Sequence, residues 1–435
     1  MSDGIGFAEI MLGLDGFKVL DVVDSDGEIE VWIETVATVV GCQVCGVRAS
    51  AQERRTVTCR DVECFGRPTR LVWLKRRWRC PEQACDAKTW TETHPGFSSR
   101  VLLTRRAGVS ATVAVGRDAV PVSLVARRFG VGWNTIHNVV AEFGTALVED
   151  PNRVGMVEQL GVDETSFRAA KPARRTEYVT AMVDLRHKIV ADVVEGRKGS
   201  DLRKWLKSKG SDWLRAVRVV ATDLTGSYRS GMAGILDHAV KVVDGFHVVQ
   251  AANRAVTAVR CRVQNELFGH RGRKGDPLYQ MRKLLLCADE KLGDTGRDRL
   301  LEGLRFGDPN DEVLGAWLAK EMVRDVYLTD DIKLAKVLLD RAIKVCITDP
   351  VAEVRKLGKM LTKWTTEILN HHRTGASNGP AEGLNLLIKK VKRAGHGFRN
   401  FANYRLRILL HAGGCDWTQL ASPVTPIRKH KTLLK

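Results

Sequence analysis

The spacing of apolar and polar positions along the 435-residue chain changes several times, and each change predicts a different kind of structure. Near the N-terminus, FKVLDVV and EIEVWIETV alternate apolar with polar residues on either side of the turn DSDG (residues 24–27). This pattern predicts a β-hairpin. A further strand is expected at TRLVWLKRRW. From about residue 100 to 150 the apolar spacing becomes helical.

The middle of the chain, residues 154–249, combines both spacings. Short β-branched runs surround the helical stretch SDLRKWLKS, which predicts an α/β layer architecture. The runs are VEQLGVD, YVTAMVDL, KIVADVV, VRVVATD and AVKVVD. Residues 250–375 are almost wholly helical in period, as in LLLCADEKL, and a basic helix follows the break SNGPAEG. The sequence therefore predicts a multidomain α/β protein, and its length fits about three domains of roughly 150 residues each.

Charge and composition narrow the class of protein. Lys plus Arg number 69 against 51 Asp plus Glu, and the formal net charge of +18 favours a polyanionic partner over a small acidic substrate. No apolar run approaches the roughly 20 residues that span a bilayer. The N-terminus MSDGIGFAEI lacks the basic and apolar regions of a secretory signal. Ten cysteines are too sparse for a disulfide scaffold, so a reducing cytoplasm is expected.

Six of the ten cysteines fall within 44 residues, which points to a metal site. Cys42 with Cys45 and Cys80 with Cys85 form two short-spaced pairs, the arrangement that a structural zinc ion needs for four tetrahedral ligands. We therefore expect a zinc-ribbon-like module. Cys59 and Cys64 form a third possible pair, so a zinc ligand set that includes one of them is an alternative. A second alternative is that the cysteines are small buried thiols that bind no metal.

The segment PVSLVARRFGVGWNTIHNVVAEFG has the pattern of a helix-turn-helix, with Gly130 in the turn. One face of its second helix is apolar (Ile136, Val139, Val140 and Phe143). The polar residues fall on a different face, where side chains can reach base edges in the major groove: Asn134, His137 and Asn138. Arg127 and Arg128 are expected to meet phosphates. The alternative is an ordinary helical hairpin with a polar outer face.

Three acids far apart in sequence are candidates for a metal-dependent active site. Asp163 and Asp223 each end a predicted strand, and Glu382 follows Asn378 and Pro380 at the predicted start of a helix, which Asn378 would cap. Clustered carboxylates bind hard divalent cations, and two such ions about 3.5–4 Å apart can cleave a phosphodiester. Taken singly, each acid is more typical of a surface or capping residue. Lys389 lies two turns after Glu382, where it could contact the phosphate beside the cut.

At these residues the chain resembles the DDE transposases of bacterial insertion sequences, in the ISL3 family. The resemblance runs from roughly residue 30 to residue 412 and includes GVDETS, TDLTGSY and VVDGFHVVQAANRAVTAVR. Its most specific part is the motif SNG-x-x-EG-x-N with the K-R and G-F that follow. Cys59 and Cys64 are not part of the family pattern.

The resemblance implies a ribonuclease-H-like catalytic core that is split by an all-helical insertion. It implies Asp163, Asp223 and Glu382 as a triad that binds two Mg²⁺ (or Mn²⁺) ions. Asp244 and His247 match the family's D-x-F-H motif and are expected to be accessory, with Asp244 as the fallback for the second acid; capping and packing are the alternative roles for both. Basic residues after the glutamate would face DNA, namely Lys390, Lys392 and Arg393.

The expected domain order follows from these elements. It is a β-hairpin and zinc-binding module (1–98), a helix-turn-helix domain (99–150), a first core segment (154–250), the helical insertion (251–375), a second core segment with Glu382 (376–412) and a basic C-terminal tail (413–435).

The function implied is binding of the terminal inverted repeats of an insertion sequence, followed by metal-dependent strand cleavage and strand transfer. Double-stranded DNA would be the partner, at element ends and target, with at least a homodimer on the DNA, in the bacterial cytoplasm at the nucleoid. A DNA-binding regulator with an inactive core is the first alternative. The second is a nuclease of the same fold that cleaves without joining.

Overall fold

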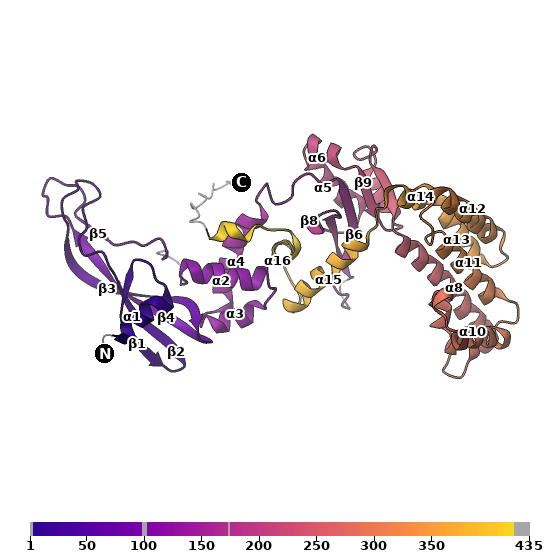
Figure 1. Cartoon of the computed structure of the whole chain (residues 1–435), viewed down its shortest axis with the longest axis horizontal. Helices are drawn as coiled ribbons and strands as arrows, with labels where there is room; N and C mark the ends of the chain where they lie inside the picture. The colour runs from indigo at the N-terminus through magenta and orange to yellow at the C-terminus, as the bar shows by residue number, and fades with distance from the viewer. Residues whose placement is uncertain (1–2, 98–101, 173–174, 422–435) are drawn as a thin grey trace. The chain divides into compact units, whose positions relative to one another are not determined.

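The computed structural model describes residues 3–97, 102–172 and 175–421. The chain divides into two compact units, one formed by residues 1–155 with 387–435 and the other by residues 156–386. Each unit contains one five-stranded β-sheet (Figure 1). Most of the expected C-terminal tail, from residue 422 onward, lies outside the described residues.

The sheet of the first unit has the strand order β1-β2-β4-β3, with β5 on β4. Its strands are β1 Phe17–Ser25, β2 Glu28–Thr35, β3 Ser50–Cys64, β4 Arg67–Arg79 and β5 Thr89–Thr91. The expected hairpin and the expected strand at residues 69–78 are confirmed as β1, β2 and β4. β2 and β4 pair in parallel and bury Val31, Ile33, Leu71 and Trp73 almost completely. The long β3, antiparallel to β4, is an element that the apolar spacing does not predict.

Helices complete the first unit: α1 Asp3–Leu12, α2 Arg105–Gly116, α3 Val122–Arg128, α4 Trp133–Val148, α16 Phe401–Ala412 and the 3-10 helix η3 Trp417–Leu420. α16 packs on α2 and α4, although more than 250 residues separate them in sequence. A Cβ at Gly144 would lie 2.8 Å from Leu410 Cδ1, so glycine lets α16 approach α4 closely. Residues 387–412, expected as part of the catalytic core, therefore contribute to the first unit.

The sheet of the second unit has the order β10-β9-β6-β7-β8. Its strands are β6 Gln159–Arg168, β7 Glu177–Asp184, β8 Ile189–Glu195, β9 Val219–Thr222 and β10 Val240–Val243. β6, β7 and β8 are antiparallel, whereas β9 runs parallel to both β6 and β10. All five strands expected between residues 154 and 249 are therefore confirmed.

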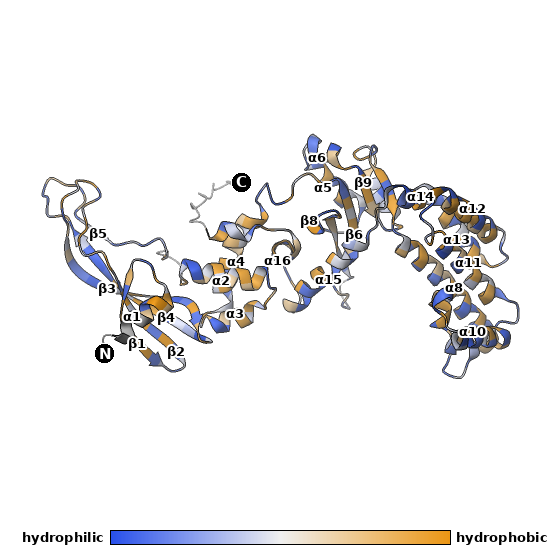
Figure 2. Cartoon of the chain, in the orientation of Figure 1, coloured by the Kyte–Doolittle hydropathy of each residue, from blue (hydrophilic) through white to orange (hydrophobic). Residues whose placement is uncertain are grey.

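Helices in the second unit are α5 Gly199–Lys207, α6 Ser211–Ala216, α7 Gly226–Met232, α8 Gly245–Phe268, α9 Pro277–Gln280, α10 Asp294–Gly307, α11 Glu312–Asp325, α12 Ile332–Thr348, α13 Ala352–Lys363 and α14 Thr365–Thr374. The expected helical segment between β10 and the SNG motif is confirmed. Apolar and polar residues alternate along α8 and α11 (Figure 2), and their apolar faces share one buried core. α15 Gly379–Ala394 continues from this unit into the first.

One expected helical stretch is interrupted. LLLCADEKL forms two short 3-10 helices, η1 Leu284–Leu286 and η2 Asp289–Lys291, instead of an α-helix. The fully buried ammonium group of Lys320 explains the break, because it donates to the carbonyls of Leu285 at 3.0 Å and Cys287 at 2.7 Å. In the described parts of the chain, no helix is both long enough and apolar enough to cross a bilayer.

Candidate functional site

The register of two parallel strands brings two of the predicted acids side by side. Val162 of β6 pairs with Thr222 of β9, so Asp163 and Asp223 are the next residues on neighbouring strands. Neighbouring strands lie about 4.8 Å apart. The expectation that Asp163 ends a strand is wrong, because pairing with β7 carries β6 on to Arg168. Asp163 instead marks the point at which β6 loses its parallel partner, and Asp223 directly follows the last residue of β9.

The charge of Glu382, the third predicted acid, acts on the carboxyl group of Asp163. Asp163 is only 8% exposed, and burial is the largest influence that raises the pKa of its carboxyl group. The negative charges of Asp223 and Glu382 raise this pKa further, whereas the backbone N–H of Glu164 and the imidazole of His247 lower it. The negative charges of Asp223 and Glu382 therefore both act on Asp163, and a cation beside Asp163 would relieve this repulsion.

Asn385 fixes the orientation of Asp163 and is a site residue that the sequence reasoning did not single out. Its side-chain nitrogen donates to Asp163 Oδ2 at 2.6 Å, while the backbone N–H of Glu164 donates to Oδ1 at 2.7 Å. Asn385 lies three residues after Glu382, so one turn of α15 carries both side chains. The final N of the SNG-x-x-EG-x-N motif was the available signal.

A second group of donors surrounds Glu382. One ligand atom from each of Asp244, His247 and Glu382 lies within 4.8 Å of the others, and His247 Nε2 is 3.8 Å from Glu382 Oε1. Asp244 occupies the N-cap position of α8, but its side chain makes no capping hydrogen bond. Its carboxylate is therefore available for another role. We call Asp163, Asp223, Asp244, His247 and Glu382 the acidic cluster.

The donor atoms of the acidic cluster suit a hard cation. In the described chain, Asp223 Oδ1 and His247 Nε2 are buried without a hydrogen-bond partner. Buried polar atoms without a partner are costly unless a ligand satisfies them. The predicted triad does not form one group with all its ligand atoms within 4.8 Å among the described residues. Asp163 and Asp223 are neighbours through the register of β6 and β9, and Glu382 is grouped with Asp244 and His247.

The N-terminus of α15 differs from its expected capping. Ala381 and Glu382 donate their backbone N–H groups to the carbonyl oxygen of Asn378, at 2.9 and 3.1 Å. The side-chain atoms of Asn378 are buried and form no hydrogen bond with a described residue, so the expected side-chain cap is not formed. Further along α15, Lys389, Lys390 and Arg393 are exposed and Lys392 is half-buried. These four bases belong to the part of the helix that packs in the first unit.

In the first unit, α3 and α4 are joined by a short turn in which Gly130 has a φ of +61°, a conformation that favours glycine. Arg127 and Arg128 at the end of α3 are exposed, as are Asn134 and Asn138 on α4. His137 was expected on the same exposed face. It is instead half-buried and stacks on Trp133, with ring centroids 4.7 Å apart. Burial, and secondly the positive charge of Arg407, lower the pKa of His137.

The four cysteines favoured by the sequence lie together. The sulfur atoms of Cys42 and Cys85 are 3.7 Å apart and those of Cys45 and Cys80 are 3.5 Å apart, and all four lie within 4.8 Å of one another. A zinc ion with bonds of about 2.3 Å to four tetrahedral sulfurs requires sulfur–sulfur distances of about 3.8 Å. The donors of this thiol cluster therefore fit zinc. The backbone N–H groups of Cys45 and Val44 lower the pKa of Cys42 to about 7, whereas burial raises the pKa of Cys80 to about 12, so a bound cation would be needed to hold Cys80 as the thiolate that zinc binds.

The other two N-terminal cysteines are elsewhere in the unit. Cys59 is buried in the apolar core of the sheet with Phe17 and Trp73, and Cys64 packs against the same core. Burial raises the pKa of Cys59 to about 12, and neither Cys59 nor Cys64 groups with the four sulfur atoms of the thiol cluster. Both are core residues and not members of the thiol cluster.

Comparison with known proteins shows similarity to transposases. The model of the ISL3 group of DDE proteins, described as "Transposase", matches residues 160–408, which is more than half of the chain. A transposase for insertion sequence element IS1001 from Bordetella parapertussis is 23% identical over 393 residues, covering 88% of this chain and 92% of that protein. An ATP-dependent protease from Lactococcus lactis is 45% identical over 51 residues, 12% of this chain and 16% of that protein.

Proposed function

Since the chain belongs to the ISL3 family of DDE transposases, we propose that it binds the terminal inverted repeats of an insertion sequence and catalyses DNA cleavage and strand transfer. The main support is the adjacency of Asp163 and Asp223 on parallel strands, together with the effect of Glu382 on the pKa of Asp163. The family match spans all three acids.

In this proposal Asp163, Asp223 and Glu382 hold two divalent cations, Mg²⁺ or Mn²⁺. When bound, these ions activate water and stabilise the leaving oxygen of a phosphodiester. Asn385 and the Glu164 amide orient Asp163. Asp244 and His247 are accessory ligands beside Glu382, and Lys389 contacts the phosphate next to the cut. Cleavage exposes a 3′-hydroxyl, which the same site then directs at target DNA.

The sheet of the second unit supports a ribonuclease-H-like core. Three antiparallel strands are followed by two parallel ones, and the helices from α8 to α14 separate β10 from α15. These helices would be the insertion that splits the core. The two aspartates and the glutamate then come from segments on both sides of the insertion.

DNA recognition belongs to the first unit in this proposal. α3 and α4 form a helix-turn-helix, with Asn134, His137 and Asn138 reading bases and Arg127 and Arg128 contacting phosphates. The thiol cluster binds a structural zinc ion that stabilises the adjoining β-sheet module. Lys390, Lys392 and Arg393 add contacts to the DNA backbone. Because two ends must meet, a homodimer or a larger assembly acts on the DNA.

The test uses the purified full chain and a DNA substrate with the repeats that flank the gene. Asp163→Asn, Asp223→Asn and Glu382→Gln should each reduce Mg²⁺-dependent cleavage by about 100–1,000-fold, a typical loss when transition-state charge stabilisation is removed. All three should retain end binding. Asp237→Asn, an exposed acid of the same unit, is the matched control and should cleave normally.

Three results would contradict the proposal. Normal cleavage by any one of the three variants removes that residue from the triad. End binding by the wild-type chain without cleavage in Mg²⁺ or Mn²⁺ supports a regulator, and cleavage without joined product supports a nuclease.

A further inference from the structure

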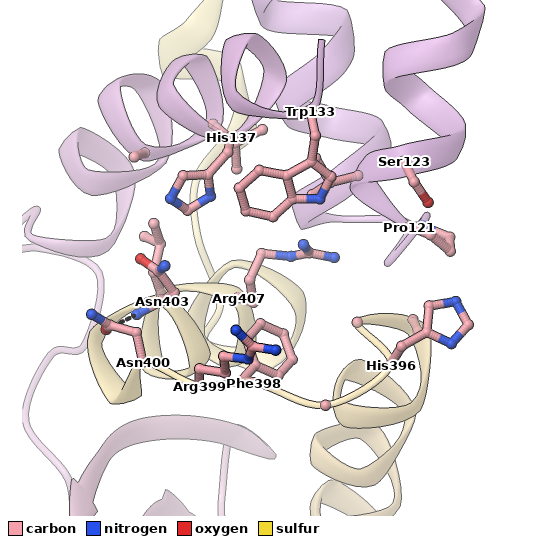
Figure 3. Close-up of a pocket in the computed structure, with 17 residues that line it drawn as sticks. Pro121, Ser123, Trp133, His137, His396, Phe398, Arg399, Asn400, Asn403 and Arg407 are labelled. Atoms are coloured by element: carbon pink, nitrogen blue, oxygen red, sulfur yellow. Dashed lines mark hydrogen bonds between the residues drawn. The ribbon is translucent and has the colours of Figure 1, made fainter.

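A cavity of about 320 Å³ lies within the first unit, between α3, α4 and the segment that joins α15 to α16 (Figure 3). Four basic or titratable side chains line it: His137, His396, Arg399 and Arg407. No Asp or Glu is among the described residues that line the cavity. A cavity with cations and no acid is suited to a negatively charged ligand.

Arg407 is the central feature of this cavity. Its side chain, on α16, is only 6% exposed and extends beneath the indole ring of Trp133 (Figure 3). One terminal nitrogen donates to the carbonyl oxygen of Val120 at 3.4 Å, a long hydrogen bond, while Nε is buried with no partner among the described residues. Burial lowers the pKa of Arg407 to about 10, so the guanidinium is still charged at neutral pH.

The charge of Arg407 is not compensated within the described chain, where it forms no ion pair. Burying an unpaired charge is strongly unfavourable, and replacement by an apolar residue of similar size is often stabilising. Arg405, two residues earlier on the same helix, shows the usual solution, since it pairs with Glu149 at 3.0 Å. Arg407 therefore has the properties of a residue kept for a ligand.

The walls of the cavity indicate more than a simple anion. Trp133 stacks on His137 with an angle of 18° between the rings, yet the indole is 49% exposed. Phe398 and apolar side chains such as Val140 and Leu406 form further walls. The volume far exceeds that of a phosphate ion. Flat aromatic surfaces beside a cation match a base and its phosphate, because every base has a face that can stack.

We infer that this cavity is a nucleotide-binding site, in which the base stacks on Trp133 and the phosphate binds the guanidinium of Arg407. The nucleotide is either a free mononucleotide or an unpaired residue of a DNA strand. All of the lining residues belong to the first unit, so the site goes beyond the cleavage reaction proposed above and does not depend on it.

The experiment measures binding of the full chain to a fluorescently labelled 12-nucleotide single strand, a duplex of the same sequence, and competing dAMP, deoxyadenosine and inorganic phosphate. Arg407→Leu and Trp133→Ala should each weaken single-strand binding by about tenfold, the effect expected for loss of one base–aromatic stack or its phosphate contact. Duplex binding should change by less than about threefold, because it depends on backbone contacts spread over many bases.

Matched controls separate the site from general charge and from folding. Arg405→Leu removes the same charge from the same helix outside the cavity, and Phe65→Ala removes an aromatic ring that is 79% exposed elsewhere in the unit. Both should bind the single strand like the wild type. Arg407→Leu should melt at the wild-type temperature or above it. If Arg407→Leu melts at a lower temperature, the single-strand affinity of Trp133→Ala tests the site instead, because that variant alters an exposed ring.

The competitors distinguish the two sources of the nucleotide. Competition by dAMP, but not by deoxyadenosine or phosphate at the same concentration, supports a site for free nucleotides. Single-strand binding that depends on Arg407 but resists dAMP supports an unpaired residue of a strand. Equal competition by phosphate and dAMP, or equal affinities of Arg407→Leu and Arg405→Leu, would overturn the inference. These measurements need no cleavage, so their failure leaves the proposed catalytic function intact.

Discussion

The thiol cluster of the first unit and the acidic cluster of the second differ in how closely their donor atoms are assembled. The four sulfurs lie at the spacing of a zinc tetrahedron, with pairs 3.5 and 3.7 Å apart. The acidic donors form two subsets. Asp163 lies on β6 and Asp223 directly follows β9, whereas Asp244, His247 and Glu382 lie on helices or at their ends. A closed donor set suits a structural ion, and an open one leaves room for a substrate.

The two clusters also differ in how the fold supports them. The cysteines come from turns near strand ends, within 44 residues of one another. The acidic residues span 220 positions, from Asp163 to Glu382, and depend on contacts such as that of Asn385 with Asp163. We therefore expect damage to the thiol cluster to appear mainly as lost stability, and damage to the acidic cluster mainly as lost activity.

The largest expected effect is loss of the zinc site. Cys80→Ala should remove the ion and unfold the surrounding module, because structural zinc contributes about 10–16 kcal/mol of apparent binding free energy in small zinc domains. Metal analysis should give one zinc per wild-type chain and none in the variant, and thermal unfolding should lose one transition. Cys64→Ala, outside the cluster, should keep the metal. Zinc retained by Cys80→Ala would exclude this ligand set.

The second largest effect is expected in the acidic cluster. Asn385→Leu removes the hydrogen bond to Asp163 Oδ2 and should lower cleavage by about 10–100-fold, the usual cost of losing a group that orients a metal ligand. Asn385 is a positioning residue, so the Mg²⁺ concentration for half-maximal cleavage should also rise. Asn385→Gln, which keeps the amide, should restore part of the rate.

A purely structural role of Asn385 predicts a different outcome. The variant would then melt early while its Mg²⁺ dependence stayed unchanged. Thermal unfolding of Asn385→Leu in the absence of metal therefore accompanies the kinetics.

A smaller effect tests the acidic cluster without DNA. Mg²⁺ at about 100 times its dissociation constant should stabilise the second unit by about 2.7 kcal/mol, because it binds the folded chain and not the unfolded one. Asp223→Asn should abolish this stabilisation, since it neutralises a carboxylate whose Oδ1 has no partner among the described residues. Thermal unfolding with and without Mg²⁺ measures the effect. Equal stabilisation of the variant would place the ion elsewhere.

The sequence predicted elements whose signals are local. Alternation around the Asp26-Gly27 turn was enough for the first hairpin, and both turn residues have positive φ. The strand β3 was missed because the first nine of its residues are exposed and carry no apolar alternation. Its existence depends on pairing with β4, a tertiary effect. In the same way, β7 extends β6 beyond Asp163.

The sequence indicated the acids of the candidate site but not the residues that orient them. Strand-end and motif positions indicated Asp163, Asp223 and Glu382, whereas the bond from Asn385 and the grouping of Glu382 with His247 arise only when distant segments meet. The burial of Arg407 had no sequence signal, because arginine in a basic helix is typical of a solvated face. Packing of α16 against α4 creates that environment.

The smallest effect concerns the Arg407 cavity, which is opposite in charge to both clusters. Burial and the charge of Arg407 lower the pKa of His137, so the unfolded chain takes up a proton at a higher pH than the folded chain does. The stability contributed by neutral His137 is therefore complete above about pH 6.5 and is lost as the pH falls through the lowered pKa.

His137→Gln should reduce this acid sensitivity in urea unfolding between about pH 5 and 7. Arg407→Leu should reduce it by a smaller amount, because the guanidinium is the second cause of the shift and burial the first. An unchanged slope in both variants would assign the acid sensitivity to other groups and would leave the cavity without the electrostatic strain that distinguishes it from the metal clusters.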